Sequence, residues 1–263
     1  MLLEAVGAAV APGSGGRQMP SFWCAPKLNI VGTSAVVGAH LSQAVGCPQV
    51  DRILGAPSDE ITVVSCGEGA TNEGEFWEAI NGACLEKLPV LFLVQDNGYA
   101  ISTPVWAQLA GGNIARLSEG VPNLLVRSVD GTDFIQSYNG LKEAISWCRD
   151  GRGPALVHAH VVRPYSHSLS DEERMYKTCK ERSSEASRDP VSRFELALIR
   201  NGVANQSSIE EIENRVETEI RDATSQILDE ASPQVLKSSS LFSRSAAVQN
   251  KNVIQILPSN GAD

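Results

Sequence analysis

The stretch ITVVSCGEGATNEGEFWEAINGACLEKLPVLFLVQDNGY, residues 61–99, decides the fold. Its two apolar runs, at 61–66 and 90–94, are too short for helices and rich in β-branched residues, which is typical of strands buried on both faces. Between them, at 73–87, apolar residues recur at helical spacing while the acidic residues can face water. The stretch therefore predicts a strand, a helix and a second strand.

The same alternation continues toward the C-terminus. Strand-like runs occupy residues 124–129 and 155–162, and a helical pattern lies between them at about 133–149. Strands that alternate with helices form parallel sheets, because each helix returns the chain to the same edge. We therefore predict an α/β fold, a parallel sheet with helices on both faces.

Further helices are predicted on either side of this core. Small residues at 34–45 favour a helix packed closely on the sheet, with Gly46 as its C-terminal cap. Two helical segments lie between 191 and 231, the second beginning with Ser208 as N-cap. The periodicity then decays, so we expect one domain over 1–232 and a Ser-rich tail or linker over 233–263.

Composition excludes several classes of protein. The chain has 263 residues and a net charge of −9, which argues against a nucleic-acid-binding surface or a basic membrane-binding surface. It contains no run of apolar residues long enough to span a membrane and no signal-peptide pattern near its start. We therefore expect a soluble, intracellular protein.

The cysteines do not form a recognisable framework. They lie singly along the chain without a CxxC pair, which argues against disulfide cross-links and a structural zinc site. We expect buried free thiols at Cys24, Cys47, Cys66, Cys84, Cys148 and Cys179.

The turn after the first strand carries the first chemical signal. Gly67 and Gly69 flank Glu68 where the strand ends and the helix begins, and ligands bind at that end of open parallel sheets. Glycines allow a sharp turn, the helix start offers N–H groups to a phosphate, and the acid can bind a bridging cation. The same pattern is also common as a plain turn.

The second signal follows the next strand. Asn97 lies 29 positions after Glu68 and begins the run Asn97-Gly98-Tyr99, so the two strand ends can converge. A carboxylate oxygen, an amide oxygen and a main-chain carbonyl suit Mg²⁺, which keeps water and substrate phosphate among its ligands. Asn-Gly alone is a common turn, but the pair at this spacing favours a metal site.

Together these motifs resemble the thiamine-diphosphate signature. The wider match, GEGATNEGEFWEAIN followed by LPVLFLVQDNGYAISTP, is similar to the alpha subunit of 2-oxoacid dehydrogenases over about residues 15–232. The segment GGRQMPSFW and Glu at position 68 are most similar to the branched-chain, or 2-oxoisovalerate, type. The resemblance implies the thiamine-diphosphate-binding fold, in its diphosphate-binding half.

The resemblance also implies the ligands. It places Mg²⁺ on Glu68, Asn97 and the Tyr99 carbonyl oxygen, and the diphosphate near Gly69 and Ala70. The residues that it implies for cofactor binding are Ala35, Val37, Gly67, Gly69, Ala70, Asn97, Arg163 and His167.

A Ser-rich loop follows the last predicted strand. Its sequence RPYSHSLSD, residues 163–171, resembles the loop of the same family. The resemblance implies that His167 assists transfer of the acyl group, that Arg163 holds the loop or a phosphate, and that Ser168 is a phosphorylation site. On the strand before it, His158 and His160 point to one face, and we interpret them as strand residues with satisfied hydrogen bonds.

The function implied is oxidative decarboxylation of a branched-chain 2-oxoacid, 3-methyl-2-oxobutanoate, with transfer of the acyl group to a lipoylated acyltransferase component. The partner would be a beta subunit, separate or fused, in an alpha2beta2 assembly. The protein would be located in the cytoplasm of a bacterium or in the mitochondrial matrix of a eukaryote. Only 14 residues precede Gly15 and no Tyr-Arg pair occurs. We therefore expect either that an N-terminal part with a diphosphate clamp is missing or that the protein has lost this phosphate ligand.

Three alternatives remain open. The chain could be a non-catalytic assembly partner of a beta subunit, or the alpha subunit of a pyruvate or acetoin dehydrogenase. A transketolase-like half would share the metal-binding turn but would not explain the loop around His167.

Overall fold

The computed structural model describes residues 2–11, 13, 15–16, 22, 24–32, 34–55 and 59–230. The chain divides into two compact units, residues 33–220 and the terminal segments 1–32 and 221–263. Most of the GGRQMPSFW segment and the whole Ser-rich tail lie outside the described residues. The larger unit contains the sheet.

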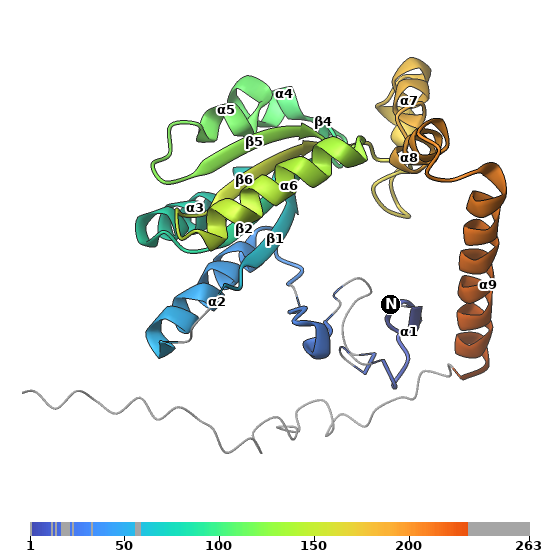
Figure 1. Cartoon of the computed structure of the whole chain (residues 1–263), viewed down its shortest axis with the longest axis horizontal. Helices are drawn as coiled ribbons and strands as arrows, with labels where there is room; N and C mark the ends of the chain where they lie inside the picture. Colours follow the sequence, from blue (N-terminus) through green and yellow to red (C-terminus); the bar gives the residue numbers. More distant parts are fainter. Residues whose placement is uncertain are drawn as a thin grey trace, which may run out of the picture. The chain divides into compact units, whose positions relative to one another are not determined.

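Four parallel strands form this sheet in the order β1-β2-β6-β5 (Figure 1). Each strand begins within one residue of its predicted position, which confirms the prediction made from the short apolar runs. The strands are β1 (Thr62–Gly67), β2 (Val90–Asp96), β5 (Leu125–Asp130) and β6 (Ala155–His160). A short antiparallel pair, β3 (Tyr99–Ala100) and β4 (Thr103–Pro104), follows β2.

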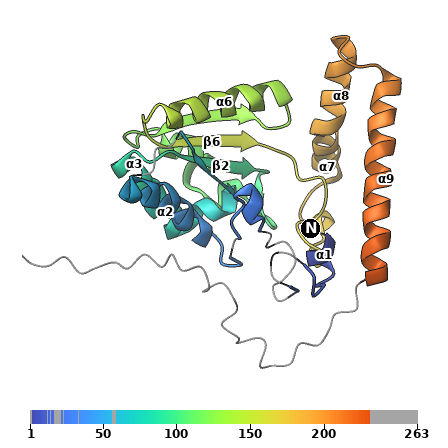
Figure 2. The ribbon, with the colours of Figure 1, turned by 60° about the horizontal axis from the view of Figure 1, so that its bottom comes forward.

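Helices cover both faces of the sheet, as the alternation predicted. Figure 2 shows α2 (Ala39–Leu54) and α3 (Gly74–Glu86) on one face and α6 (Phe134–Arg149) on the other. Phe76 of α3 and Phe92 of β2 are fully buried between the layers, with ring centroids 6.5 Å apart in an edge-on arrangement. Their burial excludes water from the sheet on the side where α2 and α3 pack.

The prediction for the first helix was wrong at both ends. The helix α2 begins at Ala39, because Gly38 has a φ of 82°, which lies outside the right-handed helical region. Gly46 lies inside the helix instead of capping it, since the buried stripe of Leu41 and Val45 continues beyond it. The cap is Gly55, whose φ of 63° ends the helix in the left-handed conformation.

The last long helix also begins earlier than predicted. Ser208 is not its N-cap, because the backbone N–H of Ser208 donates to the Asn205 side chain and the Ser208 hydroxyl accepts from the Asn205 N–H. This reciprocal pair makes Asn205 the cap.

The remaining α-helices are α1 (Leu2–Ala5), α4 (Val105–Gln108), α5 (Ile114–Ser118), α7 (Cys179–Ala186), α8 (Pro190–Arg200) and α9 (Gln206–Glu230). The 3-10 turns are η1 (Pro26–Leu28), η2 (Glu68–Asn72), η3 (Ala110–Gly112) and η4 (Glu173–Met175). Over the described residues, the helices are too short or too polar to cross a membrane.

The cysteines divide into three groups by exposure, with Cys24 intermediate between buried and exposed. All six are free, and three of them, Cys66, Cys84 and Cys148, are buried as expected. Burial, reinforced by the charge of Glu68, raises the pKa of Cys66 to about 12, so this thiol stays protonated. The prediction was wrong for Cys47 and Cys179, which are exposed on helices.

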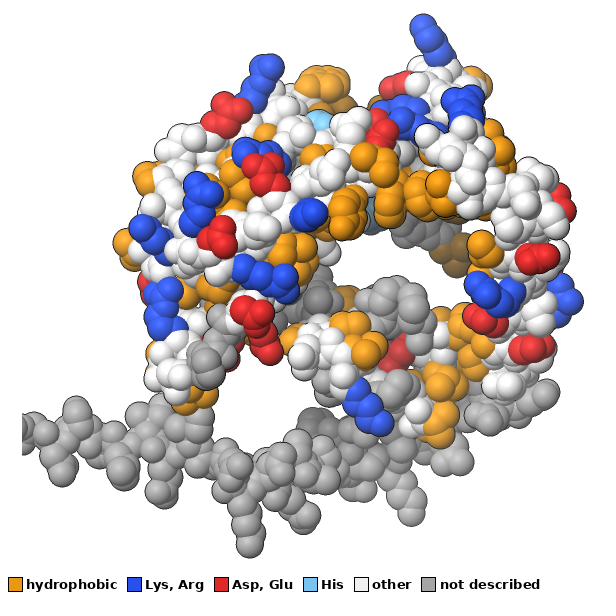
Figure 3. All heavy atoms as spheres, viewed as in Figure 1, with side chains coloured by type: hydrophobic (Ala, Val, Ile, Leu, Met, Phe, Trp, Pro, Cys, Tyr) orange, Lys and Arg blue, Asp and Glu red, His pale blue; other side chains and the backbone are white. Residues whose placement is uncertain are grey.

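The surface of the larger unit mixes charges of both signs. On the face seen in Figure 3, blue and red side chains are interspersed, and hydrophobic side chains gather where the start of α6 faces α8. Phe134 and Phe194 lie in that region with ring centroids 4.3 Å apart, beside a cavity of about 520 Å³.

Candidate functional site

The carboxyl ends of β1 and β2 bring two predicted metal ligands side by side. Gly67 is the register partner of Gln95, so Glu68 and the residues after Gln95 follow neighbouring strands at one edge. Glu68 begins the turn η2 and is only 1% exposed. Its Oε1 atom has no hydrogen-bond partner among the described residues. A buried carboxylate oxygen without a donor is costly, and a cation would satisfy it.

The electrostatics of Glu68 reflect this burial. Loss of water raises the pKa of Glu68 to about 7, and the charge of Asp96 contributes to the rise. Backbone N–H groups of Glu68 and Asn97 and the charge of Arg163 act in the opposite direction. A divalent cation would favour the ionised carboxylate in this position.

The turn after β2 is fixed by its own side chains. The Gly98 N–H donates to Asp96 Oδ1 at 2.8 Å, and the Tyr99 N–H donates to Asn97 Oδ1 at 3.2 Å. Gly98 has a φ of 84°, which glycine adopts without strain. The Asn97 amide oxygen is therefore held at the sheet edge.

Gly67, the last residue of β1, and Gly69 of η2 have different roles from those that the sequence suggested. Neither uses a positive φ, so the turn does not depend on glycine's freedom. A Cβ on Gly69 would lie 2.7 Å from the Cβ of Ala100, so this position must be small. A Cβ on Gly67 would meet no described atom within 4 Å. Protein packing explains Gly69, whereas Gly67 borders open space.

One donor near this turn was not predicted. The Gln108 side chain lies against η2, because its Oε1 accepts from the Asn72 amide at 3.4 Å. The buried Nε2 of Gln108 has no hydrogen-bond partner among the described residues. It is available to an acceptor such as a phosphate oxygen. The sequence did not predict a role for Gln108, because nothing in the residues around it distinguishes it from other polar residues of the chain.

The segment before α2 lies beside the other end of the turn. A Cβ on Gly38 would stand 3.2 Å from the Cβ of Glu73. Ala35 and Val37, on this segment, are exposed. They are therefore accessible to a ligand, although they are not helical as predicted.

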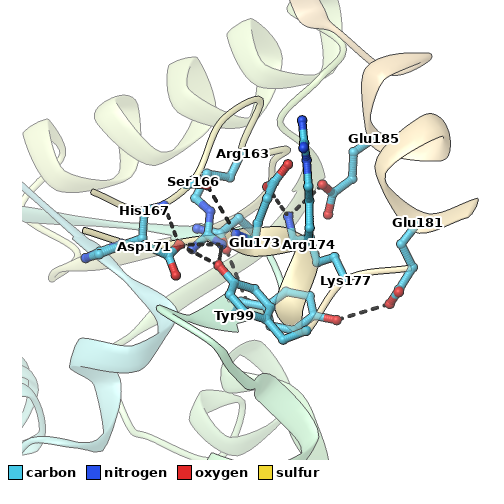
Figure 4. A network of polar contacts seen from close by, with 12 residues as sticks. Tyr99, Arg163, Ser166, His167, Asp171, Glu173, Arg174, Lys177, Glu181 and Glu185 are labelled. Atoms are coloured by element: carbon cyan, nitrogen blue, oxygen red, sulfur yellow. Dashed lines mark hydrogen bonds and ion pairs between the residues drawn. The ribbon is translucent and has the colours of Figure 1, made fainter. Parts of the chain in front are cut away.

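A second group of residues forms the loop 163–178 (Figure 4). Asp171 is its centre: Oδ2 accepts the His167 backbone N–H at 2.8 Å and the Tyr176 hydroxyl at 2.6 Å. Arg163 lies 3.9 Å from the same carboxylate and also donates to Tyr176. The Tyr176 hydroxyl, the His167 N–H and Arg163 hold the pKa of Asp171 below its usual range. The loop is thereby folded around one acceptor.

This loop is tied to the turn after β2. Arg163 donates to the Ile101 carbonyl oxygen at 3.0 Å. The Tyr99 ring lies 5.6 Å from the Tyr176 ring, and the Tyr99 hydroxyl donates to Glu181 of α7 at 3.1 Å (Figure 4). Lys177, almost fully buried, lies 2.6 Å from the Glu185 carboxylate. These contacts hold the loop 163–178 against the turn after β2.

Residues 1–235 match the family of dehydrogenase E1 components. The chain belongs to this family.

Relatives of two substrate types match the chain. It is 33% identical to the alpha subunit of 2-oxoisovalerate dehydrogenase from Bacillus subtilis, over 88% of this chain and 68% of that one. It is 34% identical to the alpha subunit of 3-methyl-2-oxobutanoate dehydrogenase from Mycobacterium tuberculosis, over 80% and 55%. It is 32% identical to the E1 component alpha subunit of pyruvate dehydrogenase from Acholeplasma laidlawii, over 74% and 56%. The chain thus spans 55–68% of the length of these E1 relatives, and identity does not separate the branched-chain from the pyruvate type.

Within this E1 chain, the predicted site residues fall into three places. Glu68 and Asn97 share the sheet edge with Gly67, Gly69 and Ala70, and Arg163 reaches that edge through Ile101. Ala35 and Val37 lie on the segment before α2. His167 and Ser168 are exposed on the loop, and the backbone of His167 is held by Asp171.

The interpretation of the strand histidines needs correction. His158 is completely buried and its Nε2 lies 2.8 Å from Asp96 Oδ2, but its Nδ1 has no hydrogen-bond partner among the described residues. His160 is half exposed, and its Nε2 lies 3.1 Å from the Ser128 hydroxyl oxygen. Sequence reasoning missed the pairing with Asp96, because only the sheet register brings β2 beside β6.

Proposed function

We propose that this E1 chain is the alpha subunit of a 2-oxoacid dehydrogenase that binds thiamine diphosphate and Mg²⁺ and acts on a branched-chain 2-oxoacid. The observation that carries the proposal is the buried Glu68, whose unpartnered oxygen lies at the same sheet edge as Asn97. Two oxygen ligands from neighbouring strand ends, with the Tyr99 carbonyl, match the preference of Mg²⁺ for hard ligands.

The residues at this edge fit the rest of the cofactor. Gly67 borders space that no described side chain fills, and the amides of Gly69 and Ala70 follow it in η2. The Nε2 of Gln108, which has no hydrogen-bond partner among the described residues, adds a donor for the diphosphate. Ala35 and Val37 are exposed for contact with the cofactor rings.

Thiamine diphosphate, when bound, supplies the carbon nucleophile and the electron sink for decarboxylation. The chain's own task is to bind and orient it. Arg163 contributes positive charge near Glu68 and holds the loop to the turn. His167 would exchange a proton at its imidazole during acyl transfer to a lipoylated carrier, because an imidazole can both donate and accept a proton.

The partners and regulation belong to the same proposal. A beta subunit would complete the site in an alpha2beta2 assembly, and a lipoylated acyltransferase component would accept the acyl group. Ser168 is exposed, with its hydroxyl 3.2 Å from that of Ser170, so a kinase could reach it. A phosphate there would repel a diphosphate nearby and disorder the loop.

The decisive experiment combines the chain with a beta subunit, thiamine diphosphate, Mg²⁺ and 3-methyl-2-oxobutanoate, and follows reduction of an artificial electron acceptor. We expect turnover that Glu68→Gln abolishes and that Glu78→Gln, an exposed acid on α3, retains. Faster turnover with pyruvate would assign the pyruvate type. Binding of the beta subunit without Mg²⁺-dependent cofactor binding in calorimetry would instead identify a non-catalytic assembly partner.

A further inference from the structure

Three side chains of the types that bind metals, separate from the proposed magnesium ligands, lie together at the carboxyl ends of β2 and β6. Asp96 is the register partner of His160, and His158 lies two residues earlier on the same strand. Side chains two positions apart on a strand point to the same face. One ligand atom from each of Asp96, His158 and His160 lies within 4.8 Å of the other two.

We propose that Asp96, His158 and His160 form a binding site for a zinc-class divalent ion. Two imidazole nitrogens and one carboxylate oxygen suit Zn²⁺ or Co²⁺, whereas Mg²⁺ prefers oxygen ligands. Three protein ligands leave a fourth position for water, as is usual where zinc is not purely structural. The ligand set thus distinguishes this site from the one at Glu68 and Asn97.

The distances are close to those that such an ion requires. His158 Nε2 lies 2.8 Å from Asp96 Oδ2, and His160 Nδ1 lies 3.9 Å from the same oxygen. Around a tetrahedral zinc with bonds of about 2.0–2.1 Å, neighbouring ligand atoms lie roughly 3.3 Å apart. These two pairs would have to shift by only about half an ångström. All three ligand atoms lie within 4.8 Å of one another.

The surrounding contacts hold the ligands in orientation. Asp96 uses Oδ1 for the Gly98 N–H, which leaves Oδ2 facing the histidines. The Ser128 hydroxyl lies 3.1 Å from His160 Nε2, which directs Nδ1 toward Asp96. Outer contacts of this kind orient metal-binding histidines and strengthen them as ligands.

Access to the site runs past His160. Its side chain is 45% exposed, whereas those of Asp96 and His158 are 7% and 0% exposed. An ion entering here would fasten the end of β2 to the end of β6 and would hold Asp96 beneath the turn that carries Asn97. This ion, of different chemistry, would lie next to the Mg²⁺ proposed at Glu68 and Asn97.

The test uses the full chain with Co²⁺ as the probe, because four-coordinate Co²⁺ absorbs visible light. Cys47→Ser and Cys179→Ser remove the exposed thiols that would compete for the probe. We expect one equivalent of Co²⁺ to bind, to be displaced by Zn²⁺ and to resist a large excess of Mg²⁺. His160→Ala should weaken binding by at least about tenfold. His40→Ala and His167→Ala, the other two histidines, should leave it unchanged.

Two readouts keep the outcomes separate. His160 is half exposed, so His160→Ala should fold even where His158→Gln does not. Zn²⁺ should raise the unfolding temperature of the parent chain but not that of His160→Ala. Equal Co²⁺ affinity in the parent chain and His160→Ala would overturn the proposal. Glu68→Gln should retain Co²⁺ binding while losing Mg²⁺-dependent cofactor binding, so this site and the proposed function fail independently.

Discussion

At the residue scale, Glu68 combines full burial with a carboxyl oxygen that accepts no hydrogen bond from the described residues. Such a residue is unfavourable for stability when it is ionised and favourable for binding a cation. The free energy that burial costs the chain alone would be recovered when a metal binds. Its pKa of about 7 makes this balance sensitive to pH in the neutral range.

Glu68→Gln should therefore stabilise the cofactor-free chain in a pH-dependent way. The carboxyl loses its proton at its ordinary pKa of 4.5 when unfolded and at about 7 when folded, so between these values the folded chain binds more protons. Stability then falls by about 1.4 kcal/mol per pH unit as pH rises, reaching a loss of about 3 kcal/mol above pH 7. Urea unfolding of both chains should show no difference below pH 4.5 and the full difference at alkaline pH. A difference independent of pH would contradict this.

Gly67, at the end of β1, and Gly69 of η2 give a matched pair of substitutions. Gly69→Ala should destabilise the chain by about 1–3 kcal/mol, because its Cβ would meet that of Ala100. Gly67→Ala, with a φ of −77° and open space around it, should change stability by less than about 0.5 kcal/mol. It should instead lower affinity for thiamine diphosphate. Urea unfolding measures the loss of stability, and calorimetry measures the affinity for thiamine diphosphate. Equal destabilisation by both variants would contradict these different roles of the two glycines.

At the element scale, the loop 163–178 is ordered by polar contacts rather than by a hydrophobic core. Asp171 accepts bonds from His167 and Tyr176, and Arg163 connects the loop to Ile101. Segments with few buried apolar contacts open locally at lower free energy than the sheet does. The loop can therefore change its order without unfolding the domain.

Asp171→Asn should loosen this loop while leaving the sheet intact. Loss of the charge weakens the bonds from His167 and Tyr176, so amide exchange across residues 163–178 should become several-fold faster by mass spectrometry. Glu172→Gln is the control, because Glu172 is exposed and, among the contacts described, its side chain contacts only Arg174. Unchanged exchange in Asp171→Asn, or equal exchange in both variants, would contradict the central role of Asp171.

At the scale of the whole molecule, the sheet and its two helical layers position everything else in the unit 33–220. The parallel register places the ends of β1, β2 and β6 at one edge, and that edge carries Glu68, Asn97 and the Asp96 cluster. Stability of this core should therefore control both proposed ion sites.

Phe92→Ala should test this dependence. Phe92 is fully buried against α3, so its removal should cost about 3–5 kcal/mol and lower the unfolding temperature. Leu85→Ala, at a position that is 79% exposed, should cost less than about 0.5 kcal/mol. Thermal unfolding by circular dichroism measures both. A small effect of Phe92→Ala would mean that the layer of α2 and α3 is not tightly packed.

The sequence alone determined the four strands and the α3 and α6 helices, because strands and helices are specified by local periodicity in apolar residues. It also placed Glu68 and Asn97 at strand ends and identified the loop around His167 from its resemblance to a family. The sequence did not predict the start of α2, because Gly38 adopts its φ of 82° where the chain passes Glu73.

Only the tertiary structure decided which side chains meet. The pairing of Asp96 with His158 joins residues 62 positions apart, and Asp171 gathers partners from the loop only once the loop is folded. Gln108 gained its place beside η2 in the same way. Local patterns fix what each segment becomes, but contacts between distant segments depend on sheet register and packing, which no single stretch of sequence encodes.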